Sequence, residues 1–295
     1  FIGKINGLKL ALDLKKGALE TDIKSLKKAA RQTIGPELEK RIQTIIDTGL
    51  IELNSDFKIY WNDFPIAKLS TGHDYLNPNF DLIVDDIIEP IQKQKLSEYI
   101  SKWIQDKINL VLKSLVDLKN LKDKNSSIKA LAYQLYENNG VLKREQVSEY
   151  LKSIGQNERK ILRDLGVKFG RYHVFLYQLI KPEAVSLRTL LWKNFHQKYY
   201  DIKPPTFGLN FLDDKENKNK NFMLLCGFEK FDSFFVRIDI LERLFMLIIN
   251  SPNSKENKEI KIEPEMLNLL GCSKDNFKKL LQKMNYKIFD KDDET

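Results

Sequence analysis

Apolar side chains recur every three or four residues over Asp22–Thr48, which is the spacing of one face of an α-helix. Pro36 interrupts this stripe, and proline removes a hydrogen bond from a helix interior. The pattern therefore predicts helix over this range and leaves open whether Pro36 splits it into two. The stripe consists of Ile23, Leu26, Ala30, Ile34, Leu38, Ile42 and Ile45.

A β-prone segment follows. The runs Phe57–Trp61 and Ile66–Leu69 flank the turn-forming residues Asn62-Asp63-Phe64-Pro65. Two β-prone runs on either side of a short polar turn are typical of a hairpin. We therefore expect one β-hairpin over Phe57–Leu69.

Helical spacing returns over Asp85–Leu118, where Pro90 is expected to divide the helix near its start. A lysine-rich link comes next. Either serine at 126–127 can cap a helix that runs to about Glu137. The residues Lys143–Ser153 predict a further helix.

The most distinctive segment is Leu165–Phe175, in which glycines interrupt β-prone residues. This pattern predicts a tight strand or turn and not a regular helix. Before it, Asn157 can cap a short helix through Arg163. After it, Pro182 suits the first turn of a helix that continues to Phe195.

The last third of the chain alternates charged loops with short elements. The run Phe235–Ile238 leads into a helix over Asp239–Ile249. A helix–turn–helix pair is expected over Pro264–Leu270 and Lys274–Met284, with Ser273 as the N-cap of its second helix. The charged loops are Asp213–Asn221 and Ser251–Lys258.

These elements predict a mainly α protein with small β elements, in the α+β class. We expect helical subdomains, one β-hairpin and a C-terminal unit that resembles a helix–turn–helix. The predicted division is a helix and hairpin in 1–84, a helical part with the basic glycine-rich segment in 85–200, and an α+β part with the charged loops in 201–295.

Composition adds limits on function. The 295 residues contain 49 Lys and Arg against 41 Asp and Glu, a net charge of +8 that permits a polyanionic partner without establishing one. No apolar run approaches the ~20 residues that a membrane helix needs. Cys226 and Cys272 lie far apart, which is typical of a reducing, cytoplasmic protein. The chain begins with Phe1 instead of Met, so we expect a piece of a longer protein.

Catalytic motifs are missing from the sequence. It contains no phosphate-cradling P-loop, no DExH motif, no GxSxG and no HExxH. Its histidines are His73, His173 and His196, which are too far apart for metal-ligand spacing. We therefore predict no catalytic residues, no metal site and no cofactor for this chain, and an independent hydrolase is disfavoured.

Basic residues gather in Gln156–Lys193, where eight Lys and Arg stand against three acids. Arginine suits phosphate because its guanidinium donates two parallel hydrogen bonds, and aromatic rings can stack on bases. The alternative is that the aromatic residues are core and the arginines pair with local acids. The candidate nucleic-acid-binding residues are Arg159, Arg163, Lys168, Arg171, Tyr172, His173, Lys181 and Arg188.

Two further groups have ordinary explanations. Arg237 and Arg243 flank Asp239 and Glu242, and ion pairs among them are the leading interpretation. The lysines of the C-terminal helix–turn–helix suggest a nucleic-acid module only weakly, because helix pairs are common in plain packing roles.

Three sequence blocks carry a resemblance: Leu162–Phe175, then Leu179–Pro182 with Leu190–Trp192, and Val236–Leu244. They resemble the region that follows the two helicase cores in bacterial relatives of the mitochondrial-degradosome RNA helicase, a superfamily-two DExH-type family. The segments Trp61–Leu69 and Pro264–Ser273 resemble that family in the same order. The resemblance spans nearly the whole chain.

The resemblance implies an accessory C-terminal region that guides or grips single-stranded RNA beside motor domains absent from this chain. It implies ATP and Mg for those motor domains and no cofactor here. A ribonuclease or another protein is a further possible partner, and no membrane partner is expected. The alternative is a protein–protein docking scaffold that does not contact RNA.

Overall fold

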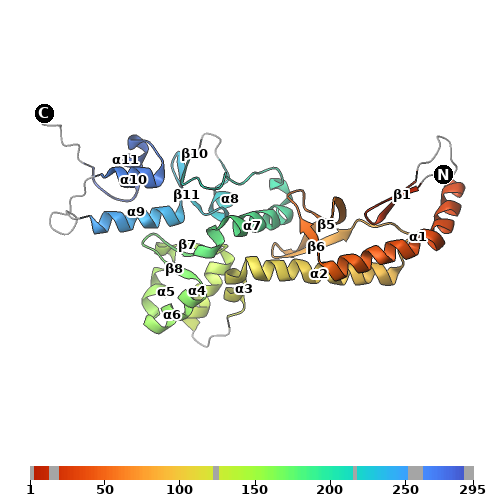
Figure 1. Cartoon of the computed structure of the whole chain (residues 1–295). Coiled ribbons are helices and arrows are strands. Elements are labelled where there is room, and N and C mark those ends of the chain that lie inside the picture. Colours follow the sequence, from red (N-terminus) through yellow and green to blue (C-terminus); the bar gives the residue numbers. More distant parts are fainter. Residues whose placement is uncertain (1–2, 13–19, 122–125, 215–217, 252–261, 289–295) are drawn as a thin grey trace. The chain divides into compact units, whose positions relative to one another are not determined.

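A computed structural model of the chain describes residues 3–12, 20–121, 126–214, 218–251 and 262–288. These residues form two compact units (Figure 1). The first unit comprises residues 1–110 and 190–202, and the second comprises 111–189 and 203–295. The predicted division into three parts, at 84 and 200, stays a prediction.

The first unit combines helices with a four-stranded antiparallel meander in the order β3-β4-β5-β6 and a two-stranded β1-β2 ribbon. Leu38, Ile42 and Ile45 on its first helix are buried, as the stripe predicted. Asn62 takes a positive φ of 50° in the hairpin turn. The elements are β1 (Gly3–Asn6), β2 (Lys9–Leu12), α1 (Glu20–Thr48), β3 (Ile51–Leu53), β4 (Lys58–Trp61), β5 (Phe64–Asp74), β6 (Asn77–Leu82), α2 (Pro90–Val111) and η3 (Gln197–Tyr199).

The first part of the second unit places a three-stranded sheet among short helices. Its strand order is β7-β9-β8, so the first strand lies beside the third. All four residues of β9 are buried. The elements are α3 (Lys113–Lys119), α4 (Ser126–Glu137), β7 (Val141–Lys143), η1 (Arg144–Val147), α5 (Ser148–Ser153), α6 (Gln156–Asp164), β8 (Val167–Phe169), β9 (His173–Leu176), η2 (Tyr177–Ile180) and the first part of α7 (Pro182–Phe195), whose residues from 190 on belong to the first unit.

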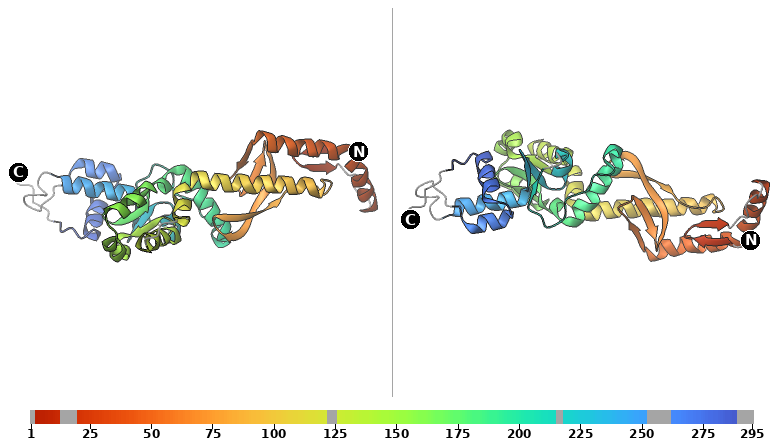
Figure 2. Two further views of the ribbon diagram at one scale, coloured as in Figure 1. Left: turned by 90° about the horizontal axis from the view of Figure 1, so that it is seen from below. Right: turned by 90° about the horizontal axis from the view of Figure 1, so that it is seen from above.

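The second part of this unit repeats the strand order in a sheet β10-β12-β11. In both sheets a glycine with positive φ, Gly166 or Gly227, joins a helix to the second strand. Figure 2 shows α10 and α11 beside α9, and their apolar faces share one core. The elements are β10 (Phe211–Asp213), α8 (Lys220–Leu225), β11 (Phe228–Phe231), β12 (Phe234–Arg237), α9 (Ile238–Asn250), α10 (Pro264–Leu270) and α11 (Lys274–Lys283).

The structure confirms the mixed α+β class and adds sheets to the single predicted hairpin. Pro36 lies inside one continuous helix, α1, and Pro90 is the first residue of α2. The segment predicted as a helix from Lys143 instead begins with the end of β7 and a 3-10 turn. The predicted strand or turn over 165–175 is confirmed as the β8–β9 hairpin.

The charged loops are described only in part. Asp213 ends β10 and Lys220 begins α8, whereas 215–217 lie outside the described residues. Nearly all of Ser251–Lys258 also lies outside them. Ser273 caps α11 as predicted, since its side chain accepts a hydrogen bond from the Asn276 amide.

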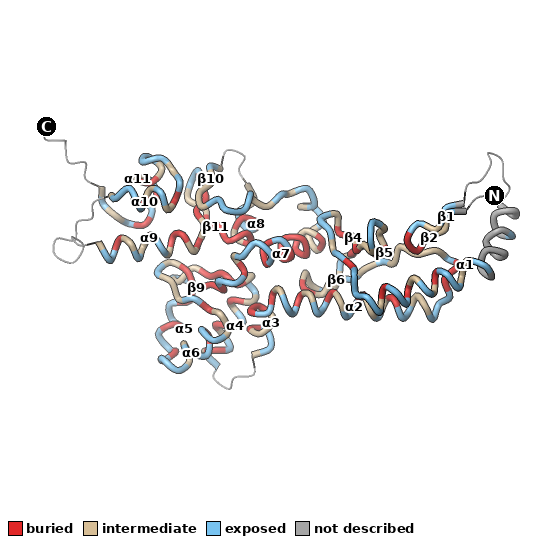
Figure 3. The backbone as a smooth tube through the Cα atoms, in the orientation of Figure 1, coloured by how far each residue is buried: buried red, intermediate tan, exposed pale blue. Residues whose placement is uncertain are grey.

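Arg188 is the largest correction to the predicted contact residues. Its side chain is fully buried in the core of the second unit, so it has no exposed surface for RNA. Its guanidinium donates to the carbonyls of Asn139, Leu179 and Leu225. Figure 3 shows the buried residues of β9 in red. Arg188 therefore ties together backbone from three separate segments.

Replacing Arg188 by Met should destabilise the protein by about 3 kcal/mol or more, because two buried carbonyls and one partly buried carbonyl lose their donor. Urea unfolding followed by circular dichroism measures the change. Lys181→Met is the matched control, since Lys181 is exposed nearby in the chain and its loss should cost about 0.5 kcal/mol or less. Equal stability of the Arg188 variant and the wild type would contradict a structural role.

Candidate nucleic-acid interface

The β7-β9-β8 sheet is formed by strands that alternate with helices along the chain. Helix α4 precedes β7, the helices α5 and α6 follow it, and the hairpin β8–β9 completes the set. Only Ile154 and Gly155 separate α5 from α6. In the sheet the first strand, β7, lies beside the third, β9. We call the hairpin loop, Gly170–Tyr172, the wing.

Glu242 on α9 holds the wing in place. Its carboxylate accepts hydrogen bonds from the backbone amides of Arg171, Tyr172 and His173, the last two at 2.9 Å. Three successive amides of this kind form an anion-binding concavity. Gly170 permits the approach, because a Cβ at that position would overlap the carboxylate. A helix some 70 residues further along the chain thus fixes the loop.

His173 connects this contact to a buried ionic network. It is 2% exposed, its Nε2 lies 3.2 Å from Oε2 of Glu229, and its Nδ1 lies 3.5 Å from Oε1 of Glu242. The Nζ of Lys143 lies 3.0 Å from Oε1 of Glu229. Both ring nitrogens of His173 therefore face carboxylates, which leaves no nitrogen to act on a substrate. His173 is corrected from a contact residue to a structural one.

Burial and charge set the pKa values of this network. Burial lowers the pKa of His173, but hydrogen bonds to Glu229 and Glu242 and their negative charges outweigh it, so the pKa lies above 6.5. Burial raises the pKa of both carboxyl groups, and their hydrogen bonds to His173 outweigh it. Lys143 assists at Glu229 and the wing amides assist at Glu242, so both pKa values lie below 4.5.

Four predicted contact residues are exposed: Arg163, Lys168, Arg171 and Lys181. The guanidinium of Arg163 lies over the Phe169 ring at 5.6 Å, and that of Arg171 over the Phe245 ring at 5.8 Å. Lys181, between η2 and α7, has no contact that connects it with the wing in the described part of the chain.

Two predicted residues are partly buried. Arg159 donates to the carbonyl of Leu151 at 2.7 Å, which ties α6 to α5. The ring of Tyr172 packs edge-on against Phe245 at 5.8 Å. Burial, together with Tyr286, raises the pKa of Tyr172 well above 10. Both side chains have structural partners, so their contribution to binding is at most partial.

Sequence reasoning missed Arg144. Strand β7 pairs Lys143 with His173, so the next residue lies directly beside the wing. The Arg144 amide donates to the carbonyl of Tyr172 at 2.8 Å, and its Nη1 donates to the carbonyl of Gly170 at 2.7 Å. The available signal was the short β-prone run Val141-Leu142 after Asn139-Gly140, which is too brief to reveal its partner strand.

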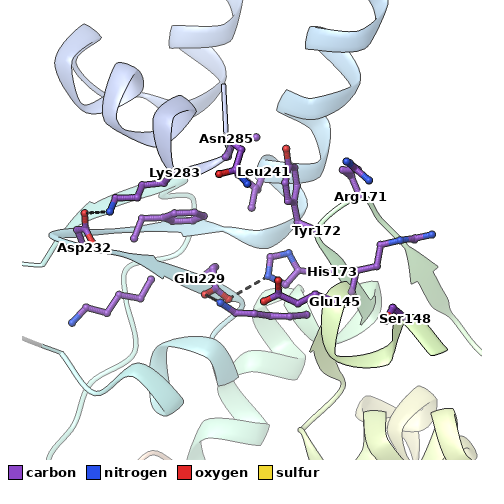
Figure 4. Close-up of a pocket in the computed structure, with 15 residues that line it drawn as sticks. Glu145, Ser148, Arg171, Tyr172, His173, Glu229, Asp232, Leu241, Lys283 and Asn285 are labelled. Carbon is purple, nitrogen blue, oxygen red and sulfur yellow. Dashed lines mark hydrogen bonds and ion pairs between the residues drawn. The ribbon is translucent and has the colours of Figure 1, made fainter. Parts of the chain in front are cut away.

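A cavity of about 600 Å³ opens beside the wing. Figure 4 shows His173 pointing toward Glu229 in it, Lys283 paired with Asp232 at another side, and Arg171 at its margin. Most of its charged lining is basic. The lining includes Lys143, Arg144, Arg171, Lys230 and Lys283, together with Glu145, Glu229 and Asp232.

The other groups considered from sequence have structural partners. Arg237 forms an ion pair with Asp239 at 2.7 Å, as predicted, whereas Glu242 binds the wing. The predicted core residues of α11 and its C-cap are buried: Phe277, Leu280, Leu281 and Met284. Among the described residues there is no group of His, Cys, Asp and Glu arranged to hold a metal ion. No helix in the described ranges has the length and apolar character to cross a membrane.

Comparisons with known proteins give no assignment. The sequence matches no protein-family model, no curated protein and no solved structure. Function must therefore be argued from the residues and their geometry.

The ionic network predicts a pH-dependent stability. Because the pKa of His173 is raised in the folded protein, its protonation stabilises the fold fully at a pH below 6.5. This stabilisation is lost as the pH rises through the pKa of the folded state. Because the pKa values of Glu229 and Glu242 are lowered in the folded protein, the two carboxylates stabilise the fold at a pH above 4.5. This stabilisation is lost as the pH falls through their pKa values in the folded state. The network should therefore contribute most between pH 4.5 and 6.5.

In urea unfolding, His173→Gln should lower stability more at a pH near 6 than at a pH near 9. His73→Gln is the control, because the His73 side chain is 92% exposed and makes only a distant contact with Asp74. A destabilisation by His173→Gln that is the same at both pH values would show that the imidazole is not charged in the folded protein.

The wing contact makes a second prediction. Gly170→Ala should displace the Glu242 carboxylate, and the amides of Arg171, Tyr172 and His173 should then exchange with solvent faster. Hydrogen exchange measures this directly. Gly35→Ala is the control, since a Cβ there would meet nothing within 4 Å. Unchanged protection of the three amides would refute the close approach.

Proposed function

We propose that this chain is the accessory C-terminal region of an ATP-dependent RNA helicase and grips single-stranded RNA beside motor domains outside this chain. ATP and Mg would act in those domains, and the protein would be cytoplasmic. The observation that carries the RNA-binding part is an exposed set of basic side chains on α6, β8 and the wing. We call this set the basic surface: Lys160, Arg163, Lys168 and Arg171.

The position of the basic surface supports the proposal. Helix α6 is the second helix of the α5–α6 pair, and the wing is the loop of the β8–β9 hairpin. In winged-helix domains, whose elements follow the same order, these two elements contact nucleic acid. Fold alone does not establish function, so the argument depends on the side chains. Within the described residues, neither Arg163 nor Arg171 has a carboxylate partner, and each guanidinium lies over an aromatic ring instead.

That arrangement leaves the edges of both guanidinium groups available to phosphate oxygens. Stacking on a ring uses the face of the guanidinium, whereas its N–H donors point outward in the plane. The wing is also ordered before binding, because Glu242 fixes its backbone. Less conformational entropy is then lost when Arg171 meets a phosphate. We propose RNA and not DNA as the ligand because of the sequence resemblance.

A docking scaffold without RNA contact is the second candidate. Exposed apolar side chains favour it: Met246 is 51% exposed and Ile249 is 37% exposed on α9. They are three positions apart (i, i+3), so they share a helix face. Apolar side chains on one face can bind a partner protein such as a ribonuclease. The two candidates differ in whether the chain itself binds RNA.

The double substitution Lys168→Glu/Arg171→Glu tests the proposal. Affinity for a short single-stranded RNA should fall at least about tenfold, because two phosphate contacts become repulsive. A plot of log affinity against log salt concentration should lose about 1.4 units of slope, roughly 0.7 for each contact. Fluorescence anisotropy across a salt series measures both quantities.

Lys102→Glu is the control, since Lys102 is an exposed lysine on α2 in the first unit. It changes the net charge in the same direction outside the basic surface. If the double variant and the control bind RNA equally well, the basic surface is not the binding site and the scaffold becomes the better explanation.

A further inference from the structure

Besides the basic surface, the second unit has basic side chains around the cavity beside the wing. It is lined by five Lys and Arg residues against three carboxylates, and about 600 Å³ suits a ligand the size of one nucleotide. We propose that this cavity binds a nucleoside monophosphate unit through its phosphate, with Arg144 as the principal donor. This inference rests on the proposed function when the unit belongs to an RNA strand.

The carboxylates of the cavity are largely neutralised by their neighbours. Lys143 and His173 both lie within 3.2 Å of Glu229 oxygens. Lys283 lies 2.7 Å from Asp232. Glu145 is the remaining acid of the lining and is exposed to solvent, where its charge is screened. Lys230 is likewise paired, with Asp214 at 2.8 Å. The positive charge that an anion can satisfy therefore comes from Arg144 and Arg171.

Arg144 and Arg171 supply that charge at the margin of the wing. The Nη1 of Arg144 donates to Gly170, which fixes the guanidinium and leaves other N–H donors for a ligand. The guanidinium of Arg171 is held over Phe245. Two guanidinium groups placed by the same loop can bind one phosphate with several charge-assisted hydrogen bonds.

The remaining lining suits a nucleoside better than a bare phosphate. Phe231 and Met284 contribute apolar surface, and Phe231 is only partly buried. An aromatic ring of this kind gives a base a stacking surface without selecting its identity. Ser148 at the start of α5 is exposed and lines the same cavity. The chemistry thus combines a phosphate site with a sequence-tolerant base site.

Titration of the full chain with AMP, inorganic phosphate and a short polyuridine strand tests this inference. Calorimetry or NMR measures each affinity for the wild type, Arg144→Gln and Lys160→Gln. Arg144→Gln should weaken AMP binding about tenfold or more, because a charge-assisted contact is lost. Lys160→Gln, on the basic surface but outside the cavity lining, should leave AMP binding unchanged and weaken binding of the strand.

Arg144 also supports the wing, so a second variant separates binding from folding. Ser148→Trp fills the cavity from an exposed position and leaves the hydrogen bonds of the wing intact. It should abolish AMP binding while the amides of Arg171–His173 keep their hydrogen-exchange protection. Phosphate alone should bind more weakly than AMP if the nucleoside contributes.

The outcomes distinguish the two proposals. AMP binding that is absent, or unaffected by both Arg144→Gln and Ser148→Trp, overturns the cavity site, whatever the strand does. Strand binding that survives Lys168→Glu/Arg171→Glu overturns the basic surface alone. AMP binding with no competition from the strand would support the cavity site and assign it to a free nucleotide instead of a unit of RNA.

Discussion

The carboxylate of Glu242 is the contact on which the candidate site depends. It accepts three successive amides of the wing and lies beside His173, which connects it to Glu229 and Lys143. Without it, two partly buried N–H groups and the exposed amide of Arg171 would lose an ionised acceptor, and hydrogen bonds to charged groups are among the strongest in proteins. The loop that carries Arg171 is therefore built by a helix distant in sequence.

This contact also decides how an external anion can bind. A nest of three amides attracts phosphate, but Glu242 already occupies it with a negative charge. Phosphate must therefore be bound by side chains around the wing and not by its backbone. Arg144 and Arg171 are the side chains in that position, and the network of Lys143 and His173 offsets the buried carboxylates that would otherwise repel a phosphate.

Local sequence signals were sufficient for most of the helices and for one hairpin. The stripe of α1 from Leu38 to Ile45, the turn at Asn62 and the helix starts at Pro182 and Ser273 each depend on a few neighbouring residues, and the structure confirms them. Contacts made across long separations could not be found in this way. Arg188 has the same local signature as Arg163, and only the three carbonyls around it make it a buried core residue.

The two three-stranded sheets share a strand order, but equivalent positions in them have different roles. Lys168 on β8 and Glu229 on β11 both lie two residues after the glycine that precedes their strand, yet one is exposed and the other is 4% exposed. The first sheet thus presents a cation to solvent, while the second turns an anion toward His173 of the first. A buried carboxylate at this position cannot contact phosphate. The second sheet therefore stabilises the first through Glu229 and does not offer a second phosphate contact at this position.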